Sequence, residues 1–168
     1  MSTKKEINQK LYEKGCLKFT ETYEKLVKQI KLIKDNKILK IDLSGSIISD
    51  KDKFSSLLDY IYDVKDKIRI EEFNFQFCEI TTDSLGKLSD VICFDMFSSL
   101  KYLNLSQCFL DINYVKYLID IIERNKSEEL SIDLKQNKIP IEGINKILSN
   151  LVNCDKNIFI DLSDNLIN

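Results

Sequence analysis

The sequence predicts an α/β protein in which five similar strand-and-helix units build one parallel sheet. One phrase returns five times: an apolar residue, a polar one, an apolar one, two polar ones, then Asn, Cys or Ser, and two places later Ile or Leu. The copies begin at Ile41, Phe73, Leu103, Ile132 and Ile160. Steps of 32, 30, 29 and 28 residues separate the Asn, Cys or Ser slots, which are Ser46, Cys78, Cys108, Asn137 and Asn165. Alternation of strand and helix patterns favours a parallel sheet.

The first 36 residues predict a helix that covers the start of this array. Apolar residues recur there at helical spacing, at Tyr23, Leu26, Val27, Ile30 and Ile33. Residues 1–40 carry a net charge of +6, and the remaining 128 carry −8. A basic amphipathic helix can bind an anionic membrane or an acidic partner. Because the apolar stripe leads directly into the first unit, we favour a cap with its lysines in solvent.

Each phrase predicts a strand whose apolar residues point into the core. The residue three places ahead is also apolar in the first three copies and is expected to point inward: Ile38, Ile70 and Leu100. In the last two copies Glu129 and Asn157 stand there, so Leu130 and Ile158 predict strands that begin one residue later. An Asn in the slot is expected to bond backbone groups of its own turn and of the next, and Cys fills the slot as a small buried side chain.

The segments between the strands have a helical period. Apolar stripes recur in them at Phe54, Leu57, Leu58, Ile61 and Val64, at Leu85, Leu88 and Ile92, at Ile112, Val115, Leu118, Ile119 and Ile122, and at Ile141, Ile144, Ile147, Leu148 and Leu151. Each unit is therefore expected to return along one helix.

Taken together, the five copies resemble the leucine-rich repeat signature L-x-x-L-x-L-x-x-N/C-x-L. Their length and helices make the chain similar to the ribonuclease-inhibitor type of that family. The resemblance implies a right-handed βα solenoid, a horseshoe or arc with a parallel concave sheet and convex helices. It covers residues 37–168, with an incomplete last unit after Ile160–Ile167, and leaves residues 1–36 as the helical cap. The last strand has no following helix, so it is a polar edge, a contact between two copies, or a point inside a longer array; of the oligomeric states, a monomer or weak dimer is expected.

Composition excludes several kinds of chemistry. Without any histidine, the chain cannot hold a Ser-His-Asp or Cys-His system or an H-E-x-x-H metal site. Its four glycines form no phosphate-binding loop, and an acidic repeat region disfavours nucleic acid. The five scattered cysteines are typical of reduced thiols, and no apolar run is long enough to span a membrane or serve as a signal peptide. We expect a cytoplasmic protein that is not an enzyme and needs no metal or cofactor.

The remaining function is binding along the concave sheet. Residues between and beside the buried pairs point outward, because strand side chains alternate. Acidic, amide and aromatic residues dominate that face, and the predicted partner-binding residues are Asp42, Glu72, Asn74, Gln76, Tyr102, Asn104, Asp133, Phe159 and Asp161. Neighbouring acids such as Asp133 and Asp161 favour a partner with a basic surface. A polar face that only keeps the sheet in solution is the alternative for any single residue.

The sequence thus predicts a protein–protein interaction module, acting as a non-catalytic adaptor or scaffold. Two alternatives stay open. The resemblance permits a regulator of an enzyme, of the small-GTPase or nuclease kind, and the composition permits a host-directed effector of a parasite or bacterium.

Overall fold

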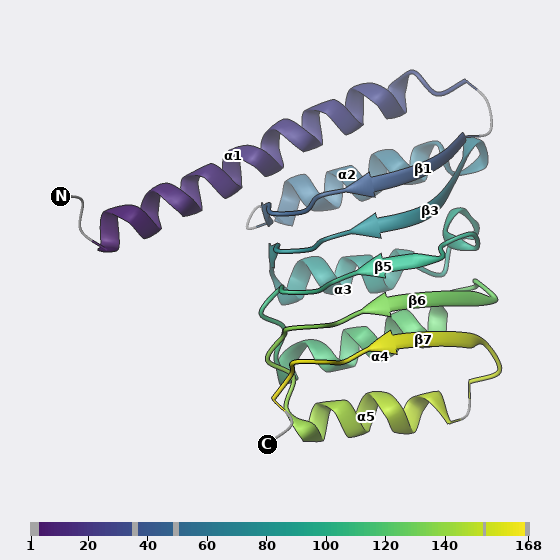
Figure 1. Cartoon of the computed structure of the whole chain (residues 1–168). Coiled ribbons are helices and arrows are strands. Elements are labelled where there is room, and N and C mark those ends of the chain that lie inside the picture. The colour runs from purple at the N-terminus through teal and green to yellow at the C-terminus, as the bar shows by residue number, and fades with distance from the viewer. Residues whose placement is uncertain (1–3, 35–36, 49–50, 153, 167–168) are drawn as a thin grey trace.

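The computed structural model describes residues 4–34, 37–48, 51–152 and 154–166, and within them the chain is a mixed α/β protein (Figure 1). Its α-helices are α1 (Lys4–Lys31), α2 (Lys51–Asp63), α3 (Thr82–Val91), α4 (Val115–Arg124) and α5 (Ile141–Leu151). Short 3₁₀ helices are η1 (Lys65–Lys67), η2 (Asp95–Phe97) and η3 (Ile112–Tyr114). The main strands are β1 (Lys37–Asp42), β3 (Ile68–Asn74), β5 (Tyr102–Asn104), β6 (Glu129–Asp133) and β7 (Asn157–Asp161).

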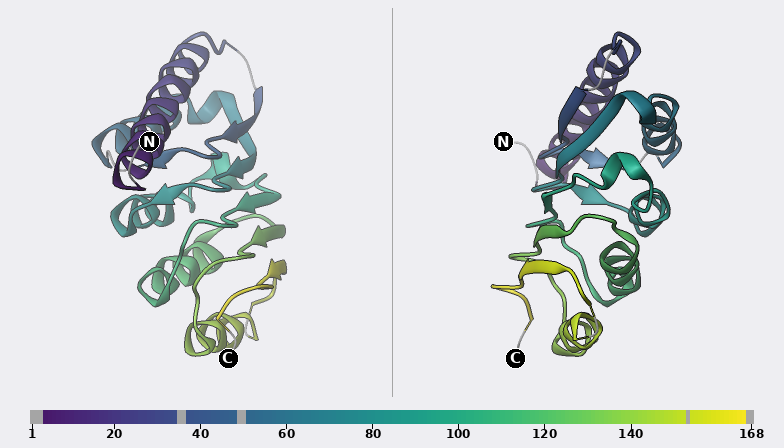
Figure 2. Two further views of the ribbon diagram at one scale, coloured as in Figure 1. Left: turned by 60° about the vertical axis from the view of Figure 1, so that its left-hand side comes forward. Right: turned by 90° about the vertical axis from the view of Figure 1, so that its right-hand side faces the viewer.

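These five strands form one parallel sheet in the order β1-β3-β5-β6-β7, which is their order along the chain. Helices α2 to α5 cover one face of the sheet, and the other face is bare of helices (Figure 2). We call this bare side the open face. Beyond the strand ends, β2 (Ile47–Ile48) pairs in parallel with β4 (Glu79–Ile80), and Pro140 bridges to Leu166.

Helix α1 occupies the segment predicted as an N-terminal cap, of which residues 1–3 and 35–36 lie outside the described chain. It runs along the β1 end of the sheet (Figure 1). Phe19, Val27 and Ile30 are buried in the same apolar cluster as the strands. Helix α1 therefore covers the apolar core at this end of the sheet.

The paired apolar residues of each phrase form the core beneath the sheet, as the sequence predicts. In the first four copies both members are at most 2% exposed, from Ile41 and Leu43 to Ile132 and Leu134. In the last copy Ile160 and Leu162 are only partly buried against that core. Ile167, the end of this copy, lies outside the described residues. Burial thus declines at β7, the last strand of the sheet.

The prediction that Ile38 points inward is wrong, since its side chain is 64% exposed. Strict alternation in β1 turns Leu39 to the core instead. In β3 a register shift opposite Leu39 and Lys40 inserts one extra residue, Glu71, and this bulge allows Ile70 to reach the core three places before Phe73. Copies one, four and five follow plain alternation, with Leu39, Leu130 and Ile158 inward. The strands of the last two copies nevertheless begin at Glu129 and Asn157, not one residue later.

The Asn slots bind backbone groups of their own turn and of the preceding one, not of the next one as expected. The Nδ2 of Asn137 donates to Leu134 O and to Leu105 O of the preceding unit, both at 2.9 Å. Its Oδ1 accepts the amides of Cys108 and Leu110 at 3.0 Å. Asn165 repeats the pattern, donating to Leu134 O and accepting from Ile139 N. Each Asn thus completes the turn that comes before it.

Cys78 and Cys108 supply one donor each in the same place. The thiol of Cys78 donates to Leu43 O and that of Cys108 to Phe75 O, both at 2.9 Å. Burial raises the pKa of Cys78 to about 11 and that of Cys108 to about 12. Ser46, in the first slot, has no preceding unit to serve. Its buried hydroxyl has no hydrogen-bond partner among the described residues.

Most residues of the predicted helical stripes are buried or partly buried, with exceptions in η3 and α5. Ile144 and Ile147 are buried, but Ile112 of η3 and Ile141 and Leu148 of α5 are exposed. No helix in the part of the chain that the structure describes is long and apolar enough to cross a membrane.

Candidate partner-binding face

One continuous row of Asp and Asn crosses the open face at the end of the strands. Register pairs join Asp42 to Asn74, Asn74 to Asn104, Asn104 to Asp133, and Asp133 to Asp161. Adjacent strands are about 4.8 Å apart, so the five side chains form a band about 19 Å long. The predicted column is therefore a surface and not a pocket.

A second row lies two residues earlier along the strands. It joins Lys40, Glu72, Tyr102, Ser131 and Phe159 in register. Gln76 lies just beyond the end of β3 and accepts a backbone bond from Gly45 through its carbonyl. All nine predicted residues thus lie on or at the end of the sheet, spread over its full width.

Each Asp or Asn of the first row also has a local structural duty. Its Oδ1 accepts the backbone amide two residues later, at 2.9 to 3.0 Å, in all five units: from Ser44, Gln76, Ser106, Lys135 and Ser163. Such side-chain bonds end a strand and begin a turn. Turn formation therefore explains part of the row. Only the charges and polar atoms that these bonds do not use are available to a partner.

Near β1 and β3 the charged side chains of the open face form ion pairs with one another. Lys40 pairs with Glu72, and Lys101 pairs with Glu71 at 2.6 Å. These contacts lower the pKa of Glu71 and raise the pKa values of both lysines. The amide of Asn74 donates to Asp42. Exposed pairs of this kind contribute little stability, but they leave little unbalanced charge on this half.

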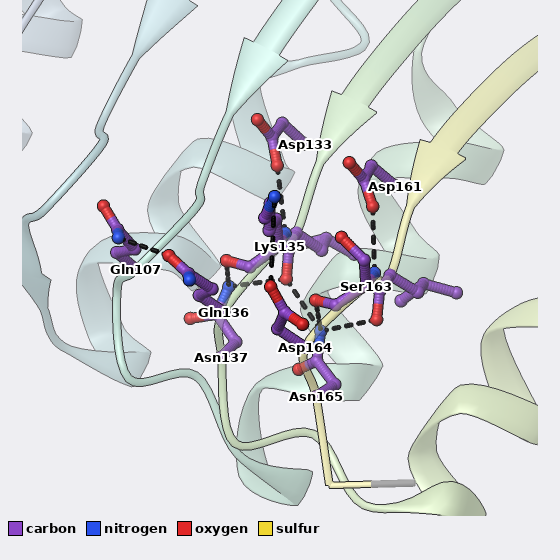
Figure 3. A network of polar contacts seen from close by, with 11 residues as sticks. Gln107, Asp133, Lys135, Gln136, Asn137, Asp161, Ser163, Asp164 and Asn165 are labelled. Carbon is purple, nitrogen blue, oxygen red and sulfur yellow. Dashed lines mark hydrogen bonds and ion pairs between the residues drawn. The ribbon is translucent and has the colours of Figure 1, made fainter.

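Near β6 and β7 the charges are not balanced in this way. Asp133 and Asp161 are register neighbours, and Asp164 follows in the next turn (Figure 3). Lys135 approaches Asp164 only to 3.9 Å. We call Asp133, Asp161, Tyr102 and Phe159 together the acidic corner.

Two groups of the acidic corner, Asp161 and Tyr102, have shifted pKa values. Hydrogen bonds from Ser163 hold the pKa of Asp161 below its usual range. The hydroxyl of Tyr102 donates to Asp133 Oδ2 at 3.3 Å, and burial together with that carboxylate raises the Tyr102 pKa. Phe159 is 60% exposed on the same face. A large aromatic beside two carboxylates suits a partner that offers a cationic side chain.

The other predicted residues contribute less accessible surface. Asn104 is only 7% exposed, and its Oδ1 already accepts both the amide and the hydroxyl of Ser106. Sequence reasoning missed Glu71, Lys101 and Asp164. Asp164 stands directly before the Asn slot, a place that adopts positive φ in every unit.

A second surface lies on the turn side of the sheet, where the first half of α1 extends past the strand ends (Figure 1). A hollow of about 1100 Å³ opens there between the helix and the turns. Exposed apolar side chains line it from α1 and from two turns: Leu11, Leu17, Phe77 and Phe109. Phe77 and Phe109 hold φ of 62° and 58°, unusual for bulky residues. Nothing in the sequence pattern indicated this groove.

The chain contains no histidine. Within the described ranges, no group of three or more Cys, Asp or Glu side chains is placed to hold a metal ion. Of the five cysteines, those in the turns have thiols whose pKa is raised by burial, the opposite of an activated nucleophile.

The chain was compared with known proteins. A scan against protein-family models finds no model that matches it, and a search of curated proteins finds no match.

Proposed function

We propose that the chain is a leucine-rich repeat module of the ribonuclease-inhibitor type. Support comes from five parallel strands in chain order with one α-helix between each successive pair from β1 to β7. The slot residues add to it, since Cys78, Cys108, Asn137 and Asn165 all donate to the carbonyl at the same position of the preceding unit. In such an array the open face is the concave one.

The function proposed for this module is to bind a protein with a basic surface on its open face, without catalysis of its own. The acidic corner carries the proposal. There Asp133 and Asp161 lie side by side next to the exposed ring of Phe159, whereas the charges around Lys40 and Glu72 pair within the chain. Like charges on neighbouring strands are unfavourable alone and become favourable against a cation. Aromatic side chains are frequent binding hot spots.

The experiment compares protein capture by wild type and by an Asp133→Asn, Asp161→Asn double variant. Asn keeps the Oδ1 that accepts the amide two residues later, as Asn74 and Asn104 do naturally. The variant therefore removes two charges and leaves the turns intact. We expect a specific partner to bind the variant at least tenfold more weakly, and the loss to shrink at high salt because exposed charges are screened.

The matched control is Asp42→Asn, which makes the same chemical change in the same row at the opposite edge. Binding that survives Asp42→Asn and fails in the double variant places the contact at the acidic corner. Equal binding by all three proteins rejects the open face as the site and directs attention to the groove beside α1. A partner identified in this way also separates an adaptor from an enzyme regulator, because a regulator changes the turnover of the enzyme it binds.

A further inference from the structure

The end of the sheet at β7 has an unpartnered strand edge and an apolar helix flank. Among the described residues no strand lies beyond β7, and α5 is the last helix beside it (Figure 1). Ile158, Ile160 and Leu162 are partly buried where the matching residues of inner strands are fully buried. The core is therefore incompletely covered at this end of the sheet.

The backbone groups available at that edge follow from the bonds that β7 makes to β6. Asn157 donates its amide to Glu128 O, and the carbonyls of Asp161 and Ser163 accept from Leu134 and Gln136. Along a strand, backbone groups of successive residues point to opposite sides. The amides and carbonyls of Ile158 and Ile160 therefore point away from β6, toward the unpaired side.

Helix α5 presents apolar side chains on the same side. Its flank toward α4 is fixed by two contacts: Asn150 donates to Glu123 of α4, and Gly143 lies close to Val115. At 100° per residue, positions 141, 148 and 152 lie on the opposite flank. These are the exposed side chains Ile141, Leu148 and Val152. Strand edge and helix flank together form one surface of the kind that a further strand and helix would cover.

We propose that a second copy of this chain covers this surface, with the two β7 strands antiparallel about a two-fold axis at Phe159. In this register Ile158 lies opposite Ile160 of the partner copy, and their outward backbone groups exchange hydrogen bonds. Phe159 faces its own equivalent at the close, non-hydrogen-bonded position. Asn157 lies opposite Asp161, so an amide meets a carboxylate.

Neighbouring registers lack this complementarity. An axis at Ile160 would set Phe159 against Asp161, and an axis at Asp161 would bring two carboxylates together. An axis at Ile158 would set Phe159 against Asn157. The register at Phe159 alone pairs apolar with apolar and polar with polar at every position of β7. An isologous contact of this kind is the commonest route to a closed dimer. It would also join the two open faces into one sheet.

The test uses the full chain and measures its mass by sedimentation equilibrium at concentrations up to about 1 mM, where even weak association is visible. Three variants are compared with wild type. Phe159→Lys and Phe159→Glu each place like charges on the axis, on a side chain that does not enter the core. Phe109→Lys is the control, because Phe109 is 59% exposed and matches Phe159 at 60%.

We expect wild type and Phe109→Lys to dimerise and each Phe159 variant to associate at least tenfold more weakly. An equal mixture of Phe159→Lys and Phe159→Glu should recover the dimer, because Lys then faces Glu across the axis. Wild type that stays monomeric overturns the proposal. A dimer that tolerates Phe159→Lys overturns it as well and moves the contact elsewhere. Failure of the mixture to recover overturns the Phe159 register.

This result is separable from the proposed function through Asp133→Asn alone, since Asp133 lies on β6 and takes no part in the contact between the two β7 strands, whereas Asp161 does. A chain that dimerises normally and binds no basic partner would uphold the dimer and reject the function.

Discussion

The two edges of the sheet are built from the same motif and end differently. At β1 the phrase residue Ile41 is 1% exposed, and α1 closes that end of the core with Phe19, Val27 and Ile30. At β7 the equivalent residue Ile160 is only partly buried. Since the motif is the same, the difference comes from the neighbour and not from the strand. A strand of this array has no complete core of its own, and its burial is decided by what lies beside it.

The strongest test of that comparison truncates the same motif residue at each edge. Ile41→Ala should lower the free energy of unfolding by about 3 to 4 kcal/mol, and Ile160→Ala by about 1 to 2 kcal/mol, because truncation of a partly buried side chain leaves a smaller cavity. Urea unfolding followed by circular dichroism measures both. Equal losses would mean that Ile160 is covered in solution, and dependence of its loss on protein concentration would assign that cover to a second copy.

The slot residues offer a second comparison, between an inner turn and the last described one. Asn137→Ala should lower the free energy of unfolding by about 3 kcal/mol, because it leaves several buried backbone groups unpaired. Asn165→Ala should lower it by about 1 kcal/mol, since Asn165 is partly exposed. Asn137→Cys, which keeps one donor as in the neighbouring turns, should fall between wild type and Asn137→Ala. A loss for Asn165→Ala as large as that for Asn137→Ala would contradict a weakly held end.

The turns that follow β3 and β5 carry the thiols of Cys78 and Cys108. They predict that the free energy of unfolding falls at alkaline pH. The pKa of Cys78 is raised to about 11 and that of Cys108 to about 12, so both thiols stay protonated in the folded chain after they ionise in the unfolded one. Their contribution to the free energy of unfolding is fully present below about pH 8.5, the pKa of a thiol in the unfolded chain. It declines as pH rises toward the folded values, by about 1.4 kcal/mol for each pH unit and each thiol.

Unfolding in urea between neutral and alkaline pH measures that decline. A Cys78→Ala, Cys108→Ala variant is the control, because it should be less stable at neutral pH yet lose less on the way to alkaline pH. If the free energy of unfolding fell equally steeply with pH in the variant, groups other than these two thiols would cause the decline.

The smallest effect is expected at the first slot. Ser46→Ala removes a buried hydroxyl without a partner among the described residues, so the free energy of unfolding should stay unchanged or rise by up to about 1 kcal/mol. Ser127→Ala is the matched control. Its buried hydroxyl donates to Phe97 O at 3.1 Å, and its loss should cost about 1 kcal/mol. Thermal unfolding of both variants measures the sign of the change in stability. A clear loss of stability for Ser46→Ala would reveal that its hydroxyl bonds to solvent or to another segment.

The parallel sheet, its strands and the rows of side chains on the open face could be predicted from the sequence, because strand alternation and helical period are visible in the local pattern. It misjudged Ile38 because the motif template assumes an extra residue that β3 supplies at Glu71 and β1 lacks. It gave the wrong direction for the Asn137 bonds, since a pattern along one chain does not tell which neighbouring turn lies within reach.

The candidate site was visible only in part. The Asp and Asn row was predicted, but its role as acceptor for Ser44, Lys135 and Ser163 depends on turn geometry that composition does not reveal. The difference between the paired charges around Lys40 and the unpaired ones at the acidic corner depends on side-chain reach across strands. The groove under Leu11 depends on the length by which α1 passes the strand ends.

The direction of the slot bonds has a consequence for synthesis of the chain. The amides of Cys108 and Leu110 are satisfied by Asn137, which leaves the ribosome 29 and 27 residues later. A newly made unit therefore keeps its turn open to water until the following unit has emerged and docked. Growth of the native structure should trail translation by one full unit, with the polar groups of each turn waiting for a residue that has not yet been made.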